Sequence, residues 1–423
     1  MADIKKYELA NGVALYHIPD AKYKTVSMSL FLNRPLSRAE ATKNALLASV
    51  LKRGTNALPE MMQLNRYLED LYGALYNISV LKKGSVQSIA FEISCLSEQY
   101  SEPGIISKCL DLLMGFLYDG KCENGAFLED YVSTEKVNLK DEIAAIVNDK
   151  RVYADFRCVE EMCRDEKCGI CELGYADDVD AIDAKSLYQH YQSITHKSPI
   201  DLFLVGEVDA EAAAAHLKAE FAKRNLDISP VPMEDAAKPA GEVQTITETM
   251  DVSQGKLSMG YRTQIGPNDP RYYALLVGNS ILGAGAHSKL FNNVREKHSL
   301  CYYVSSRMDK FSSILLIGSG IEPKNYEKAL KEIKFQVEAV KKGSYTEAEF
   351  QIAKEFIINR YQSYQDSPFL LKDFYLGNCL CGNPDTICDA IQKIKAVTFE
   401  DVILAFNQVT LDTIYFLAGK NEA

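Results

Sequence analysis

Hydrophobic and polar positions along this chain follow two different periods. Residues 25–32 (TVSMSLFL) and 201–206 (DLFLVG) are apolar runs of strand length, and residues 79–96 alternate around a Lys-Lys-Gly turn as a β-hairpin does. Helical periodicity covers residues 40–51, 61–72, 105–118, 124–163, 183–194 and 211–225. The pattern therefore predicts a mixed α+β fold.

A stretch without periodicity divides the chain, and its flanks resemble each other. Residues 228–243 contain three prolines, which is typical of a linker. Residues 181–195 align without gaps on residues 396–410, about half the chain apart, and Asp183 and Thr398 can cap the helix in each copy. We therefore predict two homologous α+β halves, each a mixed, mostly antiparallel sheet with helices packed on one face. Their expected bounds are 1–227 and 246–423, joined by a linker at 228–245.

Composition and charge narrow the function classes. A formal net charge of −11 argues against nucleic acid binding, which needs a dense basic face. The longest apolar runs are too short to span a bilayer, and the first residues lack the apolar core of a signal peptide. The chain has eleven cysteines, an odd number that cannot all pair in disulfides. We interpret them as free thiols in a reducing compartment. We expect a cytoplasmic protein without nucleic acid or membrane partners.

The most specific motif lies between residues 281 and 306 (ILGAGAHSKLFNNVREKHSLCYYVSS). Arg295 and Tyr302 stand seven residues apart there, where a charged helix-like run changes to an aromatic strand-like one. The segment resembles the C-terminal half of the pitrilysin/insulinase family of zinc peptidases, which includes the mitochondrial processing peptidases. The family pattern is a glycine turn, a helix beginning Ser-x-Leu-Phe, then R-E-K-x-G-L-A-Y. Ser299 and Cys301 stand where the family has Gly and Ala.

This resemblance implies that Arg295 and Tyr302 bind a peptide substrate at a zinc site. A phenolic O–H donates well to a scissile carbonyl oxygen that gains negative charge, and a guanidinium can clamp neighbouring carbonyls. The residues alone also allow another interpretation. Arg295 would then be a solvated charge at a helix end, and Tyr302 a strand residue packed in the core.

The family's zinc motif, H-x-x-E-H before a Gly-Thr, falls on a segment that has lost it. Ala45, Ala48 and Ser49 occupy the three functional positions, so neither an imidazole for zinc nor a carboxylate for water remains. Glu142 falls at the position of the third ligand, with Glu135 seven residues before it. Both could be retained from an ancestral site or belong to an ordinary charged helix. We expect no zinc ligands from this motif.

Cys158, Cys163, Cys168 and Cys171 form a rival candidate for a metal site. Four thiolates can bind zinc or an iron–sulfur cluster. However, the C-x4-C-x4-C-x2-C spacing differs from the usual paired C-x2-C arrangements, and cysteines are commonly small buried hydrophobic residues. The role of this group stays open at the level of the sequence.

The resemblance leads to an expected function. The chain would be the non-catalytic, peptide-binding subunit of a heterodimeric insulinase-type zinc peptidase, with zinc held by a homologous subunit that carries H-x-x-E-H. This chain would bind no cofactor and would supply Arg295 and Tyr302. An extended peptide would add to a sheet edge, for which residues 87–94 are a candidate. The alternatives are a structural or peptide-binding homodimer without catalysis, and a divergent zinc-dependent endopeptidase.

Overall fold

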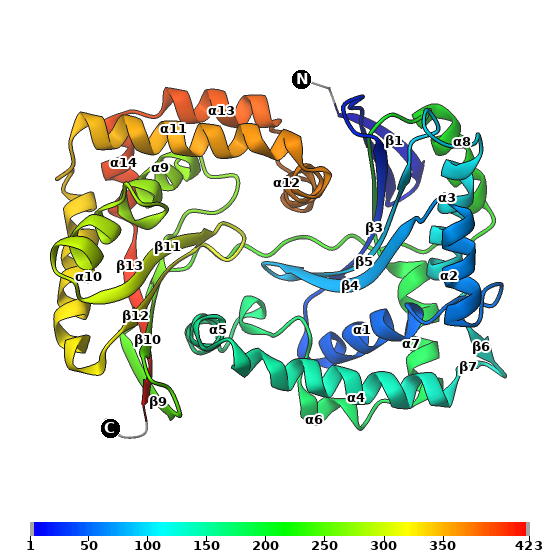
Figure 1. Cartoon of the computed structure of the whole chain (residues 1–423), viewed down its shortest axis with the longest axis horizontal. Helices are drawn as coiled ribbons and strands as arrows, with labels where there is room; N and C mark the ends of the chain where they lie inside the picture. Colours follow the sequence, from blue (N-terminus) through cyan, green and yellow to red (C-terminus); the bar gives the residue numbers. More distant parts are fainter. Residues whose placement is uncertain (1–3, 420–423) are drawn as a thin grey trace. The chain divides into compact units, whose positions relative to one another are not determined.

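The computed structural model describes residues 4–419, which form two compact units (Figure 1). Unit 1 contains the described residues up to Ala144, with Ile170–Met233 and Pro368–Leu376. Unit 2 contains Ala145–Gly169, Glu234–Ser367 and the described residues from Gly377 onward. The expected halves, 1–227 and 246–423, thus differ from the compact units by two exchanged segments.

Unit 1 is built on a six-stranded mixed sheet with the order β1-β2-β8-β3-β5-β4. Strands β2 and β8 are parallel, and the other neighbours are antiparallel. A two-stranded hairpin, β6–β7, lies outside this sheet. The strands of unit 1 are β1 (Lys5–Ala10), β2 (Val13–Ile18), β3 (Thr25–Pro35), β4 (Leu75–Lys83), β5 (Val86–Leu96), β6 (Cys122–Glu123), β7 (Ala126–Phe127) and β8 (Ile200–Val205).

Helices cover one face of this sheet, and a large apolar core lies between the helices and the sheet. Leu30 of β3 and Phe91 of β5 are fully buried in the same cluster as Leu47 and Leu113 from the helices. Burial of such side chains contributes about 1.5–3 kcal/mol each. The helices that belong wholly or largely to unit 1 are α1 (Arg38–Leu51), α2 (Met61–Asp70), α3 (Ile105–Tyr118), α4 (Glu129–Ala145), α6 (Ala176–Val179), α7 (Ala184–Lys197) and α8 (Ala210–Ala222).

Unit 2 repeats this plan with five strands in the order β11-β12-β10-β13-β9. The order and the strand directions match β4-β5-β3-β8-β2, because β13 and β9 are parallel and the other neighbours antiparallel. Asp183 and Thr398 cap α7 and α14 with the same capping box. The predicted pair of homologous α+β halves is confirmed. The strands are β9 (Gln244–Met250), β10 (Gly255–Arg262), β11 (Cys301–Asp309), β12 (Ile314–Ile321) and β13 (Thr410–Gly419).

The helices of unit 2 also include several short ones. After β10, α9 takes the place that α1 takes after β3. The α-helices are α5 (Lys150–Met162), α9 (Tyr272–Gly283), α10 (Tyr326–Lys341), α11 (Glu347–Ser363), α13 (Ile387–Ala396) and α14 (Phe399–Phe406), with α12 (Pro368–Cys381) crossing the boundary between the units. The 3-10 helices are η1 (Ile146–Asn148), η2 (Lys167–Gly169), η4 (Pro323–Asn325) and η5 (Tyr364–Asp366), and η3 (Leu290–Lys297) is a π-helix.

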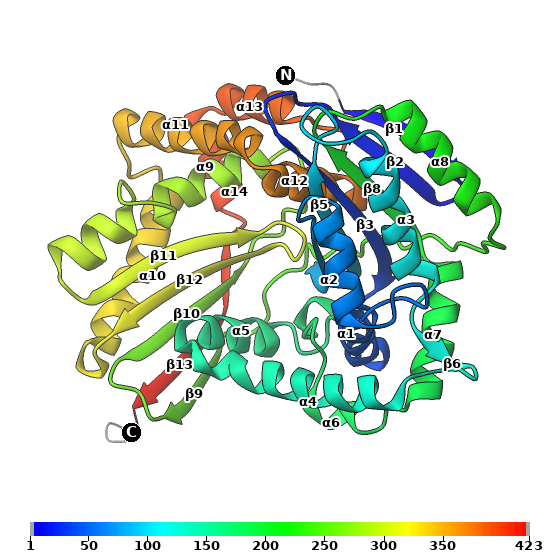
Figure 2. The ribbon, with the colours of Figure 1, turned by 45° about the vertical axis from the view of Figure 1, so that its right-hand side comes forward.

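Two helices, α5 in unit 2 and α12 in unit 1, pack on the second face of the sheets, and we call them the exchanged helices. The sequence predicted helices on one face only. Ala154 and Cys158 of α5 pack with Leu316 and Tyr415 of unit 2, and Figures 1 and 2 show α5 beside β10 and β13. In unit 1, Lys372 of α12 forms an ion pair with a glutamate of β5. Strands β8 and β12 are accordingly buried along nearly their whole length, since both faces are covered.

Two details of the sequence prediction are wrong. The helix expected at 124–163 is interrupted, because residues 124–127 belong to the β6–β7 hairpin and Asp149 caps a new helix by accepting from two backbone N–H groups. The candidate edge at 87–94 lies in β5, which pairs with β3 on one side and β4 on the other. The edge strand at this end of the sheet is β4 in unit 1, and the corresponding edge strand in unit 2 is β11. Within the described residues, every helix is too short or too polar to cross a membrane.

Candidate functional site

One cavity of unit 1 collects all the positions that the sequence assigned to a lost zinc site. Ala45, Ala48 and Ser49 share one face of α1, as residues three and four apart do, and Glu135 and Glu142 come from α4. All five line a cavity of about 420 Å³. The structure therefore brings the expected positions together.

The side chains in this cavity do not fit a zinc ion. Ala45 and Ala48 carry no donor atom, and the Ser49 hydroxyl donates to the backbone carbonyl of Ala45 at 3.4 Å. Glu142 is exposed and makes no hydrogen bond or ion pair with a described residue. A single carboxylate falls short of the three or four protein ligands that zinc sites use.

Glu135 is committed to a different contact, which the sequence did not reveal. Its carboxylate accepts from Arg53 at 3.1 Å and from Asn138 at 3.0 Å. Arg53 also stacks over the ring of Tyr131, with its guanidinium carbon 4.8 Å from the ring centre. Glu135 is therefore one partner of a largely buried ion pair that ties α4 to the end of α1. Only tertiary contact joins residues so distant in sequence.

Arg295 lies in the last turn of the π-helix η3 and is partly exposed. Its guanidinium carbon lies 4.7 Å from the ring centre of Phe291, and its Nε lies 3.5 Å from a carboxylate oxygen of Glu296. The side chain is 41% exposed. Helical turns of the π type are rare and are frequently found at functional sites. Both contacts are made by the guanidinium end of Arg295, and the side chain still leaves surface open to solvent.

Tyr302 lies at a β-bulge in the edge strand β11. The pairing with β12 shifts between Cys301 and Tyr303, so Tyr302 is the extra residue of the bulge. Its side chain is 76% exposed and makes no hydrogen bond with a described residue. Bulges re-aim side chains, often beside active sites. The interpretation of Tyr302 as a packed core residue is therefore wrong.

The turn between Arg295 and Tyr302 explains one departure from the family motif. Ser299 has a φ of +49°, in the left-handed region that favours glycine. The backbone N–H of Leu300 donates to the carbonyl of Val294 at 3.0 Å, which turns the chain from η3 into β11. A glycine at this position of the motif would relieve that conformation, and Ser299 tolerates it at a cost.

The four clustered cysteines do not form one site. Cys158 points into the core of unit 2, where its Sγ lies 3.6 Å from the carbonyl of Ser258. Cys171 belongs to unit 1. Cys163 and Cys168 lie together with Glu166, their ligand atoms all within 4.8 Å of one another. Of the rival four-cysteine candidate, the structure thus brings together one pair, Cys163 and Cys168.

Comparisons with known proteins agree with this geometry. A family model described as the peptidase M16 inactive domain matches residues 181–357. The probable inactive metalloprotease YmfF of Bacillus subtilis is similar to this chain, with 36% identity over 97% of both sequences. A conserved protein from Enterococcus faecalis V583 has a similar crystal structure, with a TM-score of 0.89, 29% identity and coverage of 100% of both chains.

A more distant structure shares the fold. The crystal structure of a peptidase M16 inactive domain from Pseudomonas fluorescens superposes with a TM-score of 0.81 at 19% identity. The superposition covers 99% of this chain and 98% of the Pseudomonas chain. The α1 cavity without zinc ligands agrees with the descriptions of these relatives as inactive. Since YmfF matches nearly the whole length at 36% identity, this chain belongs to the M16, or pitrilysin/insulinase, family of peptidases and is an inactive member of it.

Proposed function

We propose that this chain is the non-catalytic, peptide-binding subunit of a heterodimeric M16 zinc peptidase. The observation that carries the proposal is the placement of Tyr302. A tyrosine that is 76% exposed on a bulged edge strand contributes little to the core of its own chain. Its O–H makes no hydrogen bond with a described residue and is therefore available to a bound peptide.

The chemistry assigned to the two residues follows from their donors. A homologous subunit with H-x-x-E-H would hold the zinc ion and activate water. Tyr302 of this chain would donate its phenolic hydrogen bond to the scissile carbonyl oxygen, where negative charge develops in the transition state. Arg295 would clamp a neighbouring peptide carbonyl with its forked N–H groups. Neither role requires a metal ligand from this chain, which agrees with the donor set of the α1 cavity.

Strand addition is the proposed mode of peptide binding. Strand β11 lies at one end of its sheet, so one side of its backbone is open to an added strand. Tyr302 lies near the start of this strand, and η3 with Arg295 directly precedes it in the chain. An extended peptide bound along β11 would receive backbone hydrogen bonds and also pass these two side chains.

The reduced cysteines support a location in a reducing compartment, and we propose the cytoplasm. Eleven thiols include several of intermediate burial, such as Cys122 and Cys301. An oxidising compartment would expose such thiols to disulfide formation.

Co-purification with a partner tests the proposal. The chain would be expressed together with an H-x-x-E-H homologue from the same genome, with the affinity tag on this chain only. Mass spectrometry of the complex and zinc quantification would follow. We expect one copy of each chain and one zinc that disappears when the first histidine of the homologue's motif is replaced by alanine.

The alternatives make different predictions in the same experiment. A stable homodimer that captures no homologue would contradict the proposal and favour the structural or peptide-binding homodimer. Peptide cleavage by this chain alone, dependent on zinc, would favour the divergent endopeptidase. Cys163, Glu166 and Cys168 lie close enough together to hold a metal ion themselves. The zinc count therefore uses this chain with Cys168→Ser, so that only zinc held by the homologue is measured.

A further inference from the structure

A compact loop after α5 gathers two thiols and a carboxylate in unit 2. Cys163 ends the helix, and Glu166 and Cys168 follow within five residues. We call these three residues the thiol–carboxylate cluster. The loop is closed by two successive turns, with backbone N–H groups of Glu166 and Gly169 donating to Cys163 and Glu166 at 2.9 and 3.1 Å. A side chain at Gly169 would come within 2.2 Å of the Cys163 carbonyl, so the loop requires glycine there.

The spacing of the ligand atoms is close to that of a tetrahedral zinc site. Zinc binds sulfur at about 2.3 Å and carboxylate oxygen at about 2.0–2.2 Å, which places two sulfurs about 3.8 Å apart and a sulfur and an oxygen about 3.6 Å apart. The ligand atoms of the cluster lie within 4.8 Å of one another, and Cys168 Sγ lies 3.9 Å from Glu166 Oε2. In the structure the Cys168 thiol donates a hydrogen bond to the Glu166 carboxylate. A metal ion would replace the thiol proton with little movement of the loop.

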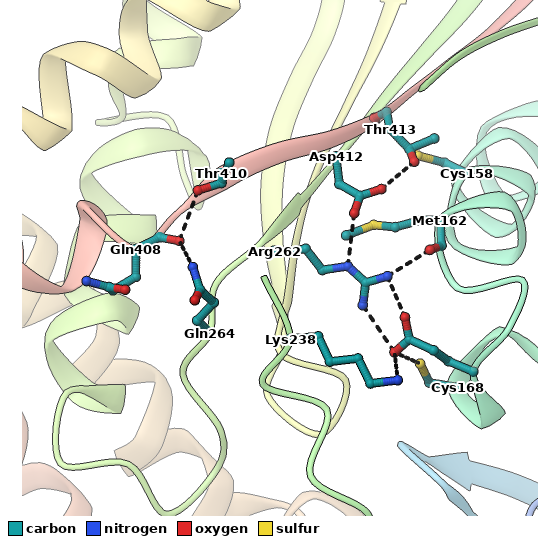
Figure 3. Close-up of polar contacts among 11 residues, drawn as sticks. Cys158, Met162, Cys168, Lys238, Arg262, Gln264, Gln408, Thr410, Asp412 and Thr413 are labelled. Carbon is teal, nitrogen blue, oxygen red and sulfur yellow. Dashed lines mark hydrogen bonds and ion pairs between the residues drawn. The ribbon is translucent and has the colours of Figure 1, made fainter. Parts of the chain in front are cut away.

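Neighbouring side chains hold the Glu166 carboxylate in position, and Figure 3 shows two of them, Arg262 and Lys238, with Asp412 and Cys168 nearby. Arg262 is 4% exposed and donates to Glu166 at 2.6 and 3.2 Å. It also donates to Asp412 at 3.2 Å, and Lys238 lies 3.4 Å from Glu166. Hydrogen-bond and ion-pair partners behind a metal ligand orient that ligand and tune the site.

The charges around the cluster balance with and without a divalent metal. Without metal, the carboxylates of Glu166 and Asp412 are matched by Arg262 and Lys238, and a thiol that keeps its proton adds no charge. With metal, two thiolates add two negative charges and a divalent ion adds two positive charges. Binding therefore exchanges two thiol protons for one ion and leaves no net charge in a buried place, where unpaired charge is costly.

From this geometry we infer that the thiol–carboxylate cluster is a zinc site with Cys163, Cys168 and Glu166 as its protein ligands. Thiolate and carboxylate together suit a borderline-soft ion such as zinc, and water can complete the coordination beside the partly exposed Glu166. The site stabilises the loop that ends α5 and takes no part in peptide cleavage. It is independent of the proposed function.

Zinc titration of the chelator-treated, fully reduced chain tests this inference. Binding would be measured by competition with a chromophoric chelator, and cobalt(II) would be added separately to look for thiolate-to-metal charge-transfer absorption. We expect one zinc per chain, thiolate absorption with cobalt, and a higher melting temperature with zinc. Cys168→Ser and Glu166→Gln each remove a ligand, so each should weaken binding by at least the roughly 10–100-fold that loss of a partner behind a ligand typically costs.

A matched control separates this site from other thiols. Cys171→Ser changes a buried cysteine three residues further along and should leave zinc affinity unchanged. Three results would overturn the inference: a folded, reduced chain that binds no zinc, zinc binding that survives Cys168→Ser, or a pair of thiols that only forms a disulfide on oxidation.

Discussion

Ser299 occupies a backbone conformation that costs the protein stability. A left-handed conformation costs a non-glycine residue about 1–2 kcal/mol, while glycine loses about 0.4–1 kcal/mol more chain entropy on folding. We therefore expect Ser299→Gly to stabilise the chain by up to about 1 kcal/mol in urea unfolding. Ser299→Ala retains a Cβ and should bring no gain. A destabilised Ser299→Gly variant would contradict the strain at this turn.

Asp201 makes stability depend on pH. Asp201 lies in β8, and its carboxylate accepts a hydrogen bond from the Asn33 side chain of β3 at 2.7 Å. Burial raises the pKa of Asp201 to about 6, above the usual 3.8. A raised carboxyl pKa means that the folded state favours the neutral form. The resulting stabilisation is complete below the unfolded pKa and is lost as pH rises through 6.

Replacement of this carboxyl tests that pH dependence. Asp201→Asn cannot ionise but keeps an oxygen that accepts from Asn33. Its stability relative to the native chain should therefore increase by about 2 kcal/mol between pH 4 and pH 8. Urea unfolding at both pH values measures the difference, and an equal difference at pH 4 and pH 8 would contradict the raised pKa.

At the scale of elements, α1 and α4 preserve the frame of a zinc site without its ligands. Ala45→His, Ala48→Glu and Ser49→His together would restore the family motif beside Glu142, in a cavity of about 420 Å³. In a Cys168→Ser background we expect the triple variant to bind one zinc, because the positions already converge. Adding Glu142→Gln should weaken that binding. A folded triple variant that binds no zinc would show that the frame has also diverged.

The sequence predicted most elements but not where some of them end. Strand β3, the β4–β5 hairpin and α3 follow from apolar periodicity alone. Strands β6 and β7 have two residues each, too few for a period to be seen. The break at Asp149 depends on a side-chain cap in a charged, helix-like run. Pattern reasoning placed the edge at 87–94 because it could not tell which neighbours β5 would pair with.

At the scale of the whole chain, the duplication was predictable and the exchange of helices was not. The matching helix–strand pairs at 181–195 and 396–410 indicated two halves. Which sheet α5 and α12 cover depends on tertiary contacts. One signal was present: ILLIGSGI in β12 is apolar without alternation, as expected of a strand with both faces covered.

The positions of the site could be predicted further than their surroundings. The family motif located Arg295, Tyr302 and the degenerate zinc positions by register in the sequence. It did not reveal the bulge that exposes Tyr302, because a bulge is a property of pairing with β12. Nor did it reveal the Arg53–Glu135 ion pair or the meeting of Cys163, Glu166 and Cys168, which arise only in the folded chain.

The most direct test of the proposed function is the turnover of the assembled heterodimer with Tyr302→Phe. Loss of one oxyanion donor lowers kcat by about 10²-fold or more, and affinity should change little because the donor acts mainly in the transition state. Tyr303→Phe is the matched control, since Tyr303 is the next residue on β11 and stacks against Arg151. We predict a loss of about 100-fold in kcat for Tyr302→Phe alone. Unchanged turnover would contradict the role of this chain in the active site.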